Sequence, residues 1–327
     1  MPTLVTGATG FLGSHIARKL AERGEKVRIL IRQSSKTVNI DDIDAERVYG
    51  DVTDMASVRK AMEGCDTLYH AAGLVSFKQA DYKRMEDVNV GGTNNVFTAA
   101  LEAGVKRVVY TSSVAAIGLR PGKELADENT PFDPNSTDIQ YILSKYRAEQ
   151  EALKFAEKGL PVVLVNPSIV IGAGDVYVST TGIILWYCKR RLPGYTDGGI
   201  NLVDAEDVAE GHLLAAEKGR VGEKYILSNR NLTIKELFET LEKVTGIPRP
   251  KFKIPYPLAY AGAYIAEKIF GISAPNYVAM DIDSIKGSKY FWYFDNSKAV
   301  KELGFAPVPL EVTIERTVEW FKEHGYL

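Results

Sequence analysis

Short apolar runs alternate with longer amphipathic stretches along the first half of the chain. The runs are rich in β-branched residues, and in the stretches between them apolar residues recur every three or four positions. Apolar strands separated by helices indicate βαβ units, and therefore a parallel sheet with helices on both faces. The predicted strands begin at Thr3, Lys26, Arg47, Thr67, Arg107 and Pro161, and the predicted helices cover 11–24, 55–64, 86–104 and 140–159.

After Gly172 the alternation becomes irregular. Two strand-like runs follow, at Asn201 and Lys224, and helical patterns cover 205–219, 233–246, 256–272 and 313–327. We therefore expect an α/β fold in two parts. A doubly wound parallel sheet occupies residues 1–172, and a smaller, mostly helical substrate-binding lobe occupies residues 173–327. We expect the lobe to return one or two strands to the sheet, so that the two parts are partly interleaved.

Composition narrows the range of partners and compartments. Among the 327 residues, 45% are hydrophobic and 25% charged, and 40 basic against 42 acidic side chains give a net charge of −2. This balance offers no attraction to nucleic acid, so we expect no nucleic-acid partner. Cys65 and Cys188 are too few for a disulfide framework and have no neighbouring metal ligand in the sequence. They favour a reducing, cytoplasmic compartment and no bound metal.

The most apolar stretch covers residues 256–272. It is short for a membrane span and carries Glu267 and Lys268. The chain opens with a strand and a glycine-rich segment, without a charged-then-apolar leader. We therefore expect a buried or interfacial helix in this stretch and no stable membrane insertion.

Three glycines, Gly7, Gly10 and Gly13, lie between the first predicted strand and the first predicted helix. The first suits a sharp turn, the second the close approach of a phosphate, and the third tight packing of the helix on the strand. The start of the helix offers free N–H groups and the positive end of its dipole to an anion. The spacing is G-x-x-G-x-x-G, whereas many dinucleotide dehydrogenases have G-x-G-x-x-G. The segment predicts a phosphate-binding loop, and a tight structural turn is the alternative.

The second predicted strand ends at Arg32, with Lys36 close behind. An acidic residue at this place selects a free ribose 2′-hydroxyl, whereas a basic residue accommodates a 2′-phosphate. The planar guanidinium group suits phosphate. The sequence therefore favours NADP (NADPH) as cofactor, with NAD as the alternative if Arg32 is only a solvent-exposed charge.

Tyr141 and Lys145 are four residues apart on a predicted helix, so their side chains share a face. A tyrosine hydroxyl titrates at about pH 10, and a neighbouring cation lowers its pKa by favouring the phenolate. The pair could transfer a proton to or from a carbonyl or alcohol, and Lys145 could also hold a nicotinamide ribose. Thr111, Ser112 and Ser113 end the preceding strand, where one hydroxyl could hold a substrate oxygen and others could cap backbone groups.

Seven segments in this order resemble the extended short-chain dehydrogenase/reductases, also called the NAD-dependent epimerase/dehydratase family. The resemblance covers nearly all of the chain, and its specific motifs lie within residues 1–175. The motifs, each with the number of its first residue, are TGATGFLG (6), GDVTD (50), HAAG (70), NVGGTNNV (89), VVYTSS (108), YILSK (141) and NPSIVIGAGD (166).

The resemblance implies a Rossmann fold in which Asp51 and Val52 contact adenine, Ala71 to Gly73 line the cofactor cleft, and Pro167 and Ser168 lie near the nicotinamide. With Arg32 added, the expected cofactor-binding residues are Gly7, Thr9, Gly10, Phe11, Leu12, Gly13, Arg32, Asp51, Val52, Ala71, Ala72, Gly73, Thr111, Tyr141, Lys145, Pro167 and Ser168.

The same resemblance implies the catalytic roles. Tyr141 is the expected proton donor or acceptor, Lys145 its electrostatic partner, and Ser113 the residue that polarises the substrate oxygen, with Ser112 the less favoured candidate. His70 is expected to be structural. Members of the family often form homodimers through two helices, which here would be 89–104 and 140–159.

The sequence has features of more than one branch of this family. Nucleotide-sugar epimerases usually carry an Arg-Asp-aromatic segment before the helix that begins near residue 205, but here the arginine is missing and Asn201 occupies the region. Tyr177, Trp186 and Tyr187 suggest an apolar wall for the substrate, although aromatic residues at helical spacing also occur in cores. The chain resembles the dihydroflavonol-4-reductase and 3β-hydroxysteroid dehydrogenase branch, and its end, 299–327, resembles hopanoid-associated sugar epimerases.

The sequence therefore predicts an NAD(P)-dependent oxidoreductase that transfers a hydride between nicotinamide and a ketone or secondary alcohol of a largely apolar small molecule. The alternative is an epimerase of a sugar or nucleotide-sugar derivative. A dehydratase is less favoured, because Asp138 is the only acidic residue close to Tyr141 in the sequence and the strand end lacks a Thr-Asp-Glu pattern. A non-catalytic cofactor-sensing protein is a third alternative, which the presence of both Tyr141 and Lys145 disfavours.

Overall fold

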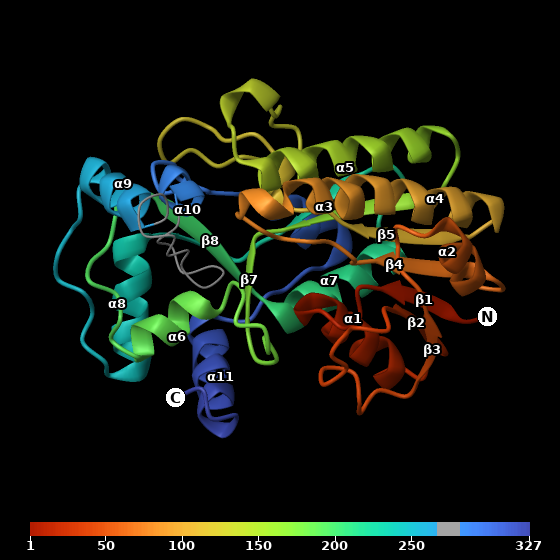
Figure 1. Ribbon diagram of the computed structural model, residues 1–327, viewed down its shortest axis with the longest axis horizontal. Helices are drawn as coiled ribbons and strands as arrows, with labels where there is room; N and C mark the ends of the chain where they lie inside the picture. The colour runs from red at the N-terminus through yellow and green to blue at the C-terminus, as the bar shows by residue number, and fades with distance from the viewer. Residues whose placement is uncertain (267–281) are drawn as a thin grey trace.

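A seven-stranded parallel sheet forms the centre of the computed structural model, which describes residues 1–266 and 282–327 (Figure 1). The strand order is β3-β2-β1-β4-β5-β6-β9, and every neighbouring pair is parallel. The predicted doubly wound α/β fold is thereby confirmed. The strands are β1 (Thr3–Thr6), β2 (Val27–Ile31), β3 (Ala45–Tyr49), β4 (Thr67–His70), β5 (Arg107–Thr111), β6 (Val162–Pro167) and β9 (Lys224–Leu227).

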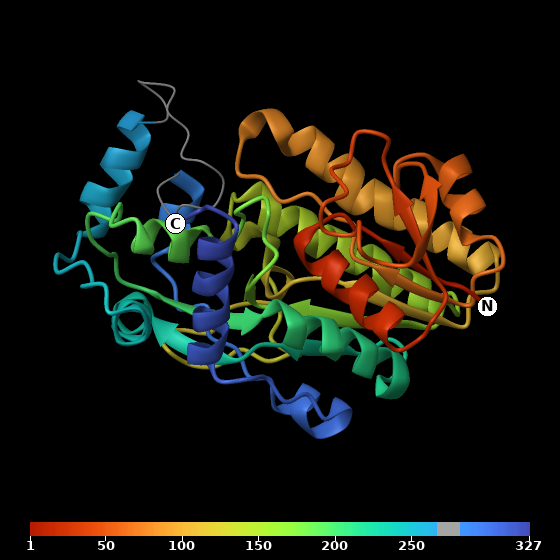
Figure 2. The same cartoon turned by 90° about the horizontal axis from the view of Figure 1, so that it is seen from below.

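Helices cover both faces of this sheet because successive strand residues point to opposite sides. Val5 faces a core built with α1 (Phe11–Glu22) and α7 (Ala205–Lys218), whereas its neighbour Leu4 faces a core built with three other helices. These are α2 (Met55–Met62), α4 (Gly92–Glu102) and α5 (Gln140–Glu157). The two helical layers lie on opposite sides of the strands in Figure 2.

The helix expected over 86–104 starts earlier and contains a wider turn. A short 3-10 turn, η1 (Gln79–Asp81), leads into α3 (Tyr82–Glu86), and the π-helical turn η2 (Asp87–Gly91) joins α3 to α4. Within the wide turn, buried Asn89 donates to the Leu74 carbonyl at 2.9 Å and to Ser144 Oγ at 3.0 Å. Asn89 thus ties this helix to the segment after β4 and to α5, which carries Tyr141.

The second lobe contains a small sheet that the sequence does not predict. Strands β7 (Ile169–Ile171) and β8 (Gly199–Asp204) pair in parallel, and β10 (Arg230–Thr233) pairs antiparallel with β8. The run at Asn201 is therefore a strand of this second sheet, while the run at Lys224 is β9 and returns to the main sheet as expected. β10 has the sequence RNLT, which has no apolar periodicity to mark it as a strand.

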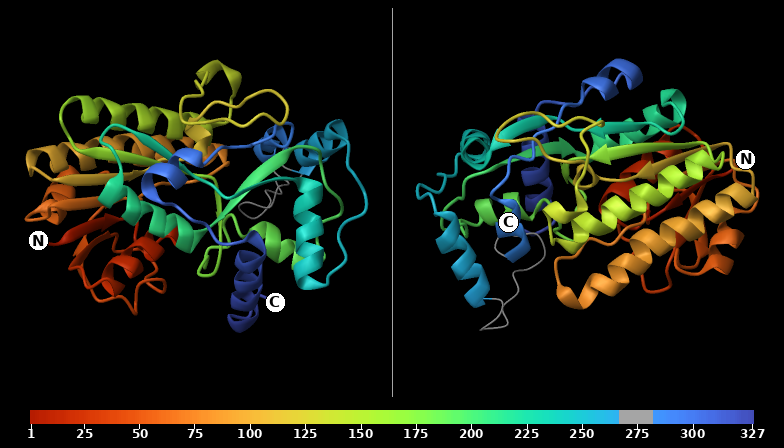
Figure 3. Two further views of the ribbon diagram at one scale, coloured as in Figure 1. Left: turned by 180° about the vertical axis from the view of Figure 1, so that it is seen from behind. Right: turned by 90° about the horizontal axis from the view of Figure 1, so that it is seen from above.

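Helices α6 (Gly182–Cys188), α8 (Ile234–Thr245) and α11 (Leu310–Glu323) pack around the small sheet in a core of their own, and Figure 3 shows them gathered at one end of the molecule. Two elements from beyond the predicted boundary at residue 172 belong to the main sheet: α7 packs on one of its faces, and β9 pairs with β6. The other short elements are η3 (Val114–Ala116), η4 (Pro134–Ser136), α10 (Ile282–Gly287) and the π-helical turn η6 (Ala299–Leu303).

The apolar stretch that begins at Tyr256 forms α9 (Tyr256–Tyr264). The rest of the predicted helix, from residue 267 and including Glu267 and Lys268, lies outside the described residues. Within the described part of the chain, no helix is long and apolar enough to span a membrane.

Candidate active site

The glycine-rich segment combines a tight turn with an open helix end. Gly7 has φ +78°, and a Cβ there would lie 2.6 Å from the backbone of Ala71 and Ala72. A Cβ on Gly13 would lie 2.2 Å from the Gly7 carbonyl oxygen, so α1 packs directly on the turn. At Gly10, the N-cap of α1, no side chain caps the helix. The first and third glycines are thus required by packing, and the first N–H groups of α1 are free to donate hydrogen bonds to an anion.

The predicted site residues lie where consecutive parallel strands end. Ala71 to Gly73 follow β4, Thr111 to Ser113 end β5, and Pro167 ends β6, so all three groups lie on the same edge of the sheet as the glycine turn after β1. Ligands of open α/β sheets bind at this edge. The structure therefore places the expected phosphate loop and the expected hydroxyl groups along one edge.

Tyr141 and Ser113 meet at the start of α5. Ser113 is the polar side chain that acts on the Tyr141 hydroxyl, and Tyr141 packs edge-on against Phe77, with ring centroids 5.8 Å apart. Burial raises the pKa of Tyr141, and the Ser113 side chain lowers it. The helical spacing predicts that Lys145 lowers this pKa, but the side chain that lowers it in the structure is Ser113.

Lys145 lies one turn further along α5 and is directed at the end of β5. Its ammonium group donates to the Thr111 carbonyl at 2.9 Å and lies 5.5 Å from the centre of the Tyr110 ring. Burial lowers its pKa to about 8, and the charge of Glu149 opposes this shift. Lys145 is therefore a cation near neutral pH, fixed beside the strand end that carries Ser113.

The three hydroxyl groups that end β5 have different partners. Thr111 lies 2.8 Å from His212 Nε2, while His212 Nδ1 lies 2.7 Å from the Val208 carbonyl. Burial lowers the pKa of His212 to about 4, so the neutral ring donates through Nδ1 and accepts the Thr111 proton through Nε2. Ser112 donates to Glu149 at 2.6 Å. The geometry thus favours Ser113 over Ser112 as the partner of Tyr141, although Ser113 also accepts the Ala115 N–H at 3.1 Å.

A pocket of about 430 Å³ lies beyond the ends of β2 and β3. It contains two of the expected cofactor residues, exposed Arg32 and half-buried Asp51, whose carboxylate accepts bonds from the backbone and hydroxyl of Thr53. A second guanidinium group, that of Arg84 on α3, also lines it and was missed by the sequence analysis. The full lining is Arg32, Asp51, Thr53, Arg84, Asp87, Val88, Gly91 and Asn95.

His70 is fully buried at the end of β4. It lies 2.7 Å from the Thr6 hydroxyl and 3.1 Å from the Thr93 hydroxyl, and burial lowers its pKa to about 3. The ring is therefore neutral and joins β1, β4 and α4. This geometry agrees with the structural role expected for it.

The three aromatic residues expected to form an apolar wall lie in different surroundings. Tyr187 belongs to the core of the second lobe and donates to the Ile247 carbonyl, Trp186 stacks with Arg191, and Tyr177 is exposed. The expectation is wrong for Tyr187, which faces the interior of the lobe because its helix, α6, packs on the small sheet. The aromatic residues clustered with Tyr141 are Phe77, Phe132 and Trp292. Trp292 lies in the run YFWYF, which is the signal that could have identified it.

Asn201 and Asp138 both have structural partners. Asn201 accepts a bond from the Ser168 hydroxyl at 2.8 Å and donates to Asn231 at 2.8 Å, thereby joining the end of β6 to β8 and β10. Asp138 forms an ion pair with Lys286 at 2.6 Å, and this hydrogen bond lowers the pKa of the carboxyl. Asp138 is thus ionised near neutral pH and unsuited to donate a proton, as a dehydratase would require.

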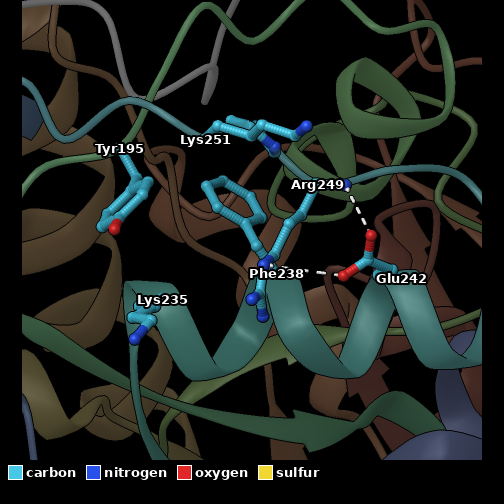
Figure 4. Close-up of a pocket in the computed structure, with 7 residues that line it drawn as sticks. Tyr195, Lys235, Phe238, Glu242, Arg249 and Lys251 are labelled. Atoms are coloured by element: carbon cyan, nitrogen blue, oxygen red, sulfur yellow. Dashed lines mark hydrogen bonds and ion pairs between the residues drawn. The ribbon is translucent and has the colours of Figure 1, made fainter.

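The second lobe has a separate pocket of about 370 Å³, shown in Figure 4. It lies between α8 and the segment after it, with Phe238 and Tyr195 at its base and Lys235, Arg249 and Lys251 at its rim. Arg249 is paired with Glu239 at 2.5 Å and Glu242 at 3.5 Å. None of the predicted site residues lines this pocket.

Neither cysteine has the surroundings of a reactive thiol. Burial raises the pKa of both Cys65 and Cys188. Within residues 1–266 and 282–327, no group of three or more His, Cys, Asp or Glu side chains is arranged to hold a metal ion.

Comparison with known proteins places this fold and site in a family. The sequence profile of the NAD dependent epimerase/dehydratase family matches residues 3–228. The chain is 39% identical to "Putative dihydroflavonol 4-reductase" of Synechocystis sp., over 99% of this chain and 95% of that protein. It is 36% identical to "Sterol demethylase protein B" of Methylococcus capsulatus, over the full length of both. The crystal structure of gox2253 superposes with a TM-score of 0.88 at 41% identity, over 99% of each chain.

The chain therefore belongs to the NAD dependent epimerase/dehydratase family, the extended short-chain dehydrogenase/reductases, and the resemblance noted from its motifs is confirmed. It is an NAD(P)-dependent oxidoreductase of this type, either a reductase or an epimerase, with a Rossmann-like fold.

Proposed function

We propose that the protein is a reductase or dehydrogenase acting on a ketone or secondary alcohol of a largely apolar small molecule. The observation that carries this proposal is that Ser113, Tyr141 and Lys145 gather at the edge of the sheet where ligands bind: Lys145 donates to the Thr111 carbonyl at the end of β5, and Ser113 lowers the pKa of Tyr141. When bound, the nicotinamide supplies or accepts the hydride at the substrate carbon. The remaining chemistry is a proton transfer at the substrate oxygen, which these side chains can perform.

In the reducing direction, the Tyr141 hydroxyl gives its proton to the substrate oxygen as the carbon becomes tetrahedral. Ser113 donates a hydrogen bond to the same oxygen and holds it in place. Ser113 lowers the pKa of Tyr141 and so favours the phenolate that remains there, and the Lys145 cation, fixed at the Thr111 carbonyl, adds an attraction once the phenolate has formed. In the oxidising direction the same groups act in reverse, so that Tyr141 removes the alcohol proton.

The cofactor is held by the residues that end the first strands. The open N–H groups at the start of α1 suit a pyrophosphate, and at Gly10 even a Cβ would lie only 3.2 Å from the Gly7 carbonyl oxygen. Ala71 to Gly73, Pro167 and Ser168 are proposed to border the nicotinamide half, and Asp51 and Val52 the adenine. Thr9, Phe11 and Leu12 complete the phosphate loop.

NADP is the favoured cofactor because Arg32 and Arg84 line one pocket beside Asp51. Two guanidinium groups offer several N–H donors to a 2′-phosphate, whereas a free 2′-hydroxyl is better matched by an acidic residue at the end of β2. Titration of the purified protein with NADPH and NADH, followed by the fluorescence of the reduced nicotinamide, tests this preference. Tighter binding of NADPH is expected, and equal or tighter binding of NADH would contradict it.

An apolar substrate is supported by the aromatic side chains around Tyr141. Phe77, Phe132 and Trp292 cluster with it. In addition, Asn201 occupies the region in which nucleotide-sugar epimerases usually carry the arginine that binds the diphosphate. Turnover of NADPH with a panel of aromatic, steroidal and small hydrophilic ketones tests this. Faster turnover of the apolar ketones is expected, and turnover limited to hydrophilic ketones would overturn the substrate class.

An epimerase of a sugar or nucleotide-sugar derivative is the second candidate, because the family includes epimerases by name. An epimerase regenerates its cofactor in each cycle and so retains it. Cofactor that stays with the protein through gel filtration would favour this reading, and cofactor that exchanges freely would favour the reductase.

We also infer that the protein works in the cytoplasm and forms a homodimer through α4 and α5. The two free cysteines suit a reducing compartment. Light scattering coupled to gel filtration tests the dimer: a mass near twice 36.0 kDa is expected, and a monomeric mass would refute it.

A further inference from the structure

Glu149 is a carboxylate with no exposed surface, one turn beyond Lys145 on α5. Its Oε2 atom accepts hydrogen bonds from the Ser112 hydroxyl and from Asn166 Nδ2, each at 2.6 Å. Its Oε1 atom lies 2.8 Å from the ammonium group of Lys224 on β9. A carboxylate is costly to bury unless it is paired and hydrogen-bonded, and this one has partners from three strands.

The partners of Glu149 connect it to the main chain on which Ser113 is mounted. The Nδ2 group of Asn166 that bonds Glu149 also donates to the Ser113 carbonyl at 2.9 Å. Ser112 precedes Ser113 and is fixed through its side chain. The same strand end supplies the Thr111 carbonyl that accepts the Lys145 ammonium group. One carboxylate thus restrains the segment that orients both Ser113 and Lys145.

We propose that Glu149 is a positioning residue of the active site: its hydrogen bonds fix the Ser113 main chain, and its buried carboxylate lies one helical turn from Lys145. This inference rests on the proposed function of Ser113, Tyr141 and Lys145. Glu149 touches neither substrate nor cofactor and acts through its neighbours.

The charges around Lys145 give the sign of the effect. Tyr141 on α5, Tyr110 on β5, His70 on β4 and His212 on α7 are neutral near pH 7, since burial raises the pKa of both tyrosines and lowers that of both histidines. Glu149 is the anion next to Lys145 on α5, and Lys224 on β9 partly neutralises it. Removing the Glu149 charge should therefore lower the pKa of Lys145, and removing the Lys224 charge should raise it.

The test follows Lys145 directly, without a substrate. Protein labelled with carbon-13 at lysine Cε is titrated by NMR from about pH 6 to about pH 11, a range that spans the ordinary lysine value, and the signal missing in Lys145→Met is assigned to Lys145. In Glu149→Gln the midpoint of this signal is expected to fall by about one pH unit or more. An unchanged midpoint would overturn the proposal. Glu151→Gln is the matched control, because Glu151 is on the same helix and pairs with Lys154 at 2.7 Å.

If Glu149→Gln does not fold, Lys224→Met tests the same proposal. In Lys224→Met the carboxylate keeps its Ser112 and Asn166 bonds, and the Lys145 midpoint is expected to rise. A midpoint that stays or falls would contradict the electrostatic role. Glu149→Asp, which keeps the charge, should restore most of the wild-type midpoint while lowering kcat, because the shorter side chain draws away from Asn166.

The outcomes separate this inference from the proposed function. If Tyr141→Phe retains full turnover, the proposed function fails whatever Lys145 does. If Tyr141→Phe abolishes turnover but Glu149→Gln leaves the Lys145 midpoint in place, only the role of Glu149 fails.

Discussion

The two halves of the molecule are stabilised in different ways. In the cofactor-binding half, strands such as β1 and β6 are buried along their whole length and packed between helices. In the second lobe, amide side chains join short strands and loops: Asn201 to Asn231, Asn231 to the Phe294 carbonyl, and Asn229 to the Val308 carbonyl. The first arrangement depends on apolar area and gives a rigid sheet edge. The second depends on directional bonds between segments that are far apart in the chain.

The largest effect is expected at the junction of the two halves, in Tyr141→Phe. Loss of the proton donor should lower turnover by about a thousandfold, while NADPH affinity stays nearly unchanged, because Phe keeps the ring and its contact with Phe77. Steady-state kinetics and nicotinamide fluorescence measure the two effects. Tyr146→Phe, on the same helix, is the control and should behave as wild type; loss of cofactor binding alone in Tyr141→Phe would contradict the assignment.

Gly13→Ala should break the rigid half. The new Cβ would lie 2.2 Å from the Gly7 carbonyl oxygen, so α1 must move away from the turn. The free energy of unfolding should fall by about 3 kcal/mol, and most of the cofactor affinity should be lost. Urea denaturation and cofactor titration check this. Gly262→Ala on α9, where a Cβ meets no atom within 4 Å, is the control; it should leave cofactor affinity unchanged and should not lower the free energy of unfolding, since Ala favours a helix more than Gly does. Equal effects of the two substitutions would contradict the packing argument.

Asn201→Ala tests the directional bonds of the second lobe. It leaves the buried Ser168 hydroxyl and the Asn231 amide without this partner and should lower the free energy of unfolding by about 2 kcal/mol, as measured in urea. Cofactor affinity should change little. A loss below about 0.5 kcal/mol, the range of ordinary surface substitutions, would show that these bonds are not what holds the small sheet to β6.

The smallest effect is expected at the rim of the cofactor site, in Arg32→Ser. Removing one guanidinium group should weaken NADPH binding by about tenfold, the loss of one charge-assisted contact, and leave NADH binding unchanged. Fluorescence titration with both nucleotides provides its own control. An equal loss for NADH would mean that Arg32 contacts a part common to both cofactors.

The sequence was most informative where local patterns decide the structure. Apolar runs and glycines predict the strands and helices of the first half, and the order of the motifs predicts the site edge. The strand β10 was not predictable, and the run YFWYF marks Trp292 as an aromatic candidate without placing it beside Tyr141, because both placements depend on segments far away in the chain. The same holds for Glu149: helical spacing places it on the Lys145 face, but its partners Ser112, Asn166 and Lys224 come from three strands.

The position of β9 affects how the chain can fold during synthesis. β6 pairs with β5 on one side and with β9 on the other, and α7 covers one face of the main sheet. A nascent chain that ends near residue 172 therefore has an unpaired strand edge and an uncovered apolar face, which are features that favour aggregation. The main sheet cannot be completed until residues 205–227, which form α7 and β9, have left the ribosome. Truncation near residue 172 should therefore yield an insoluble fragment. The second lobe is thus needed to fold the part of the enzyme that precedes it.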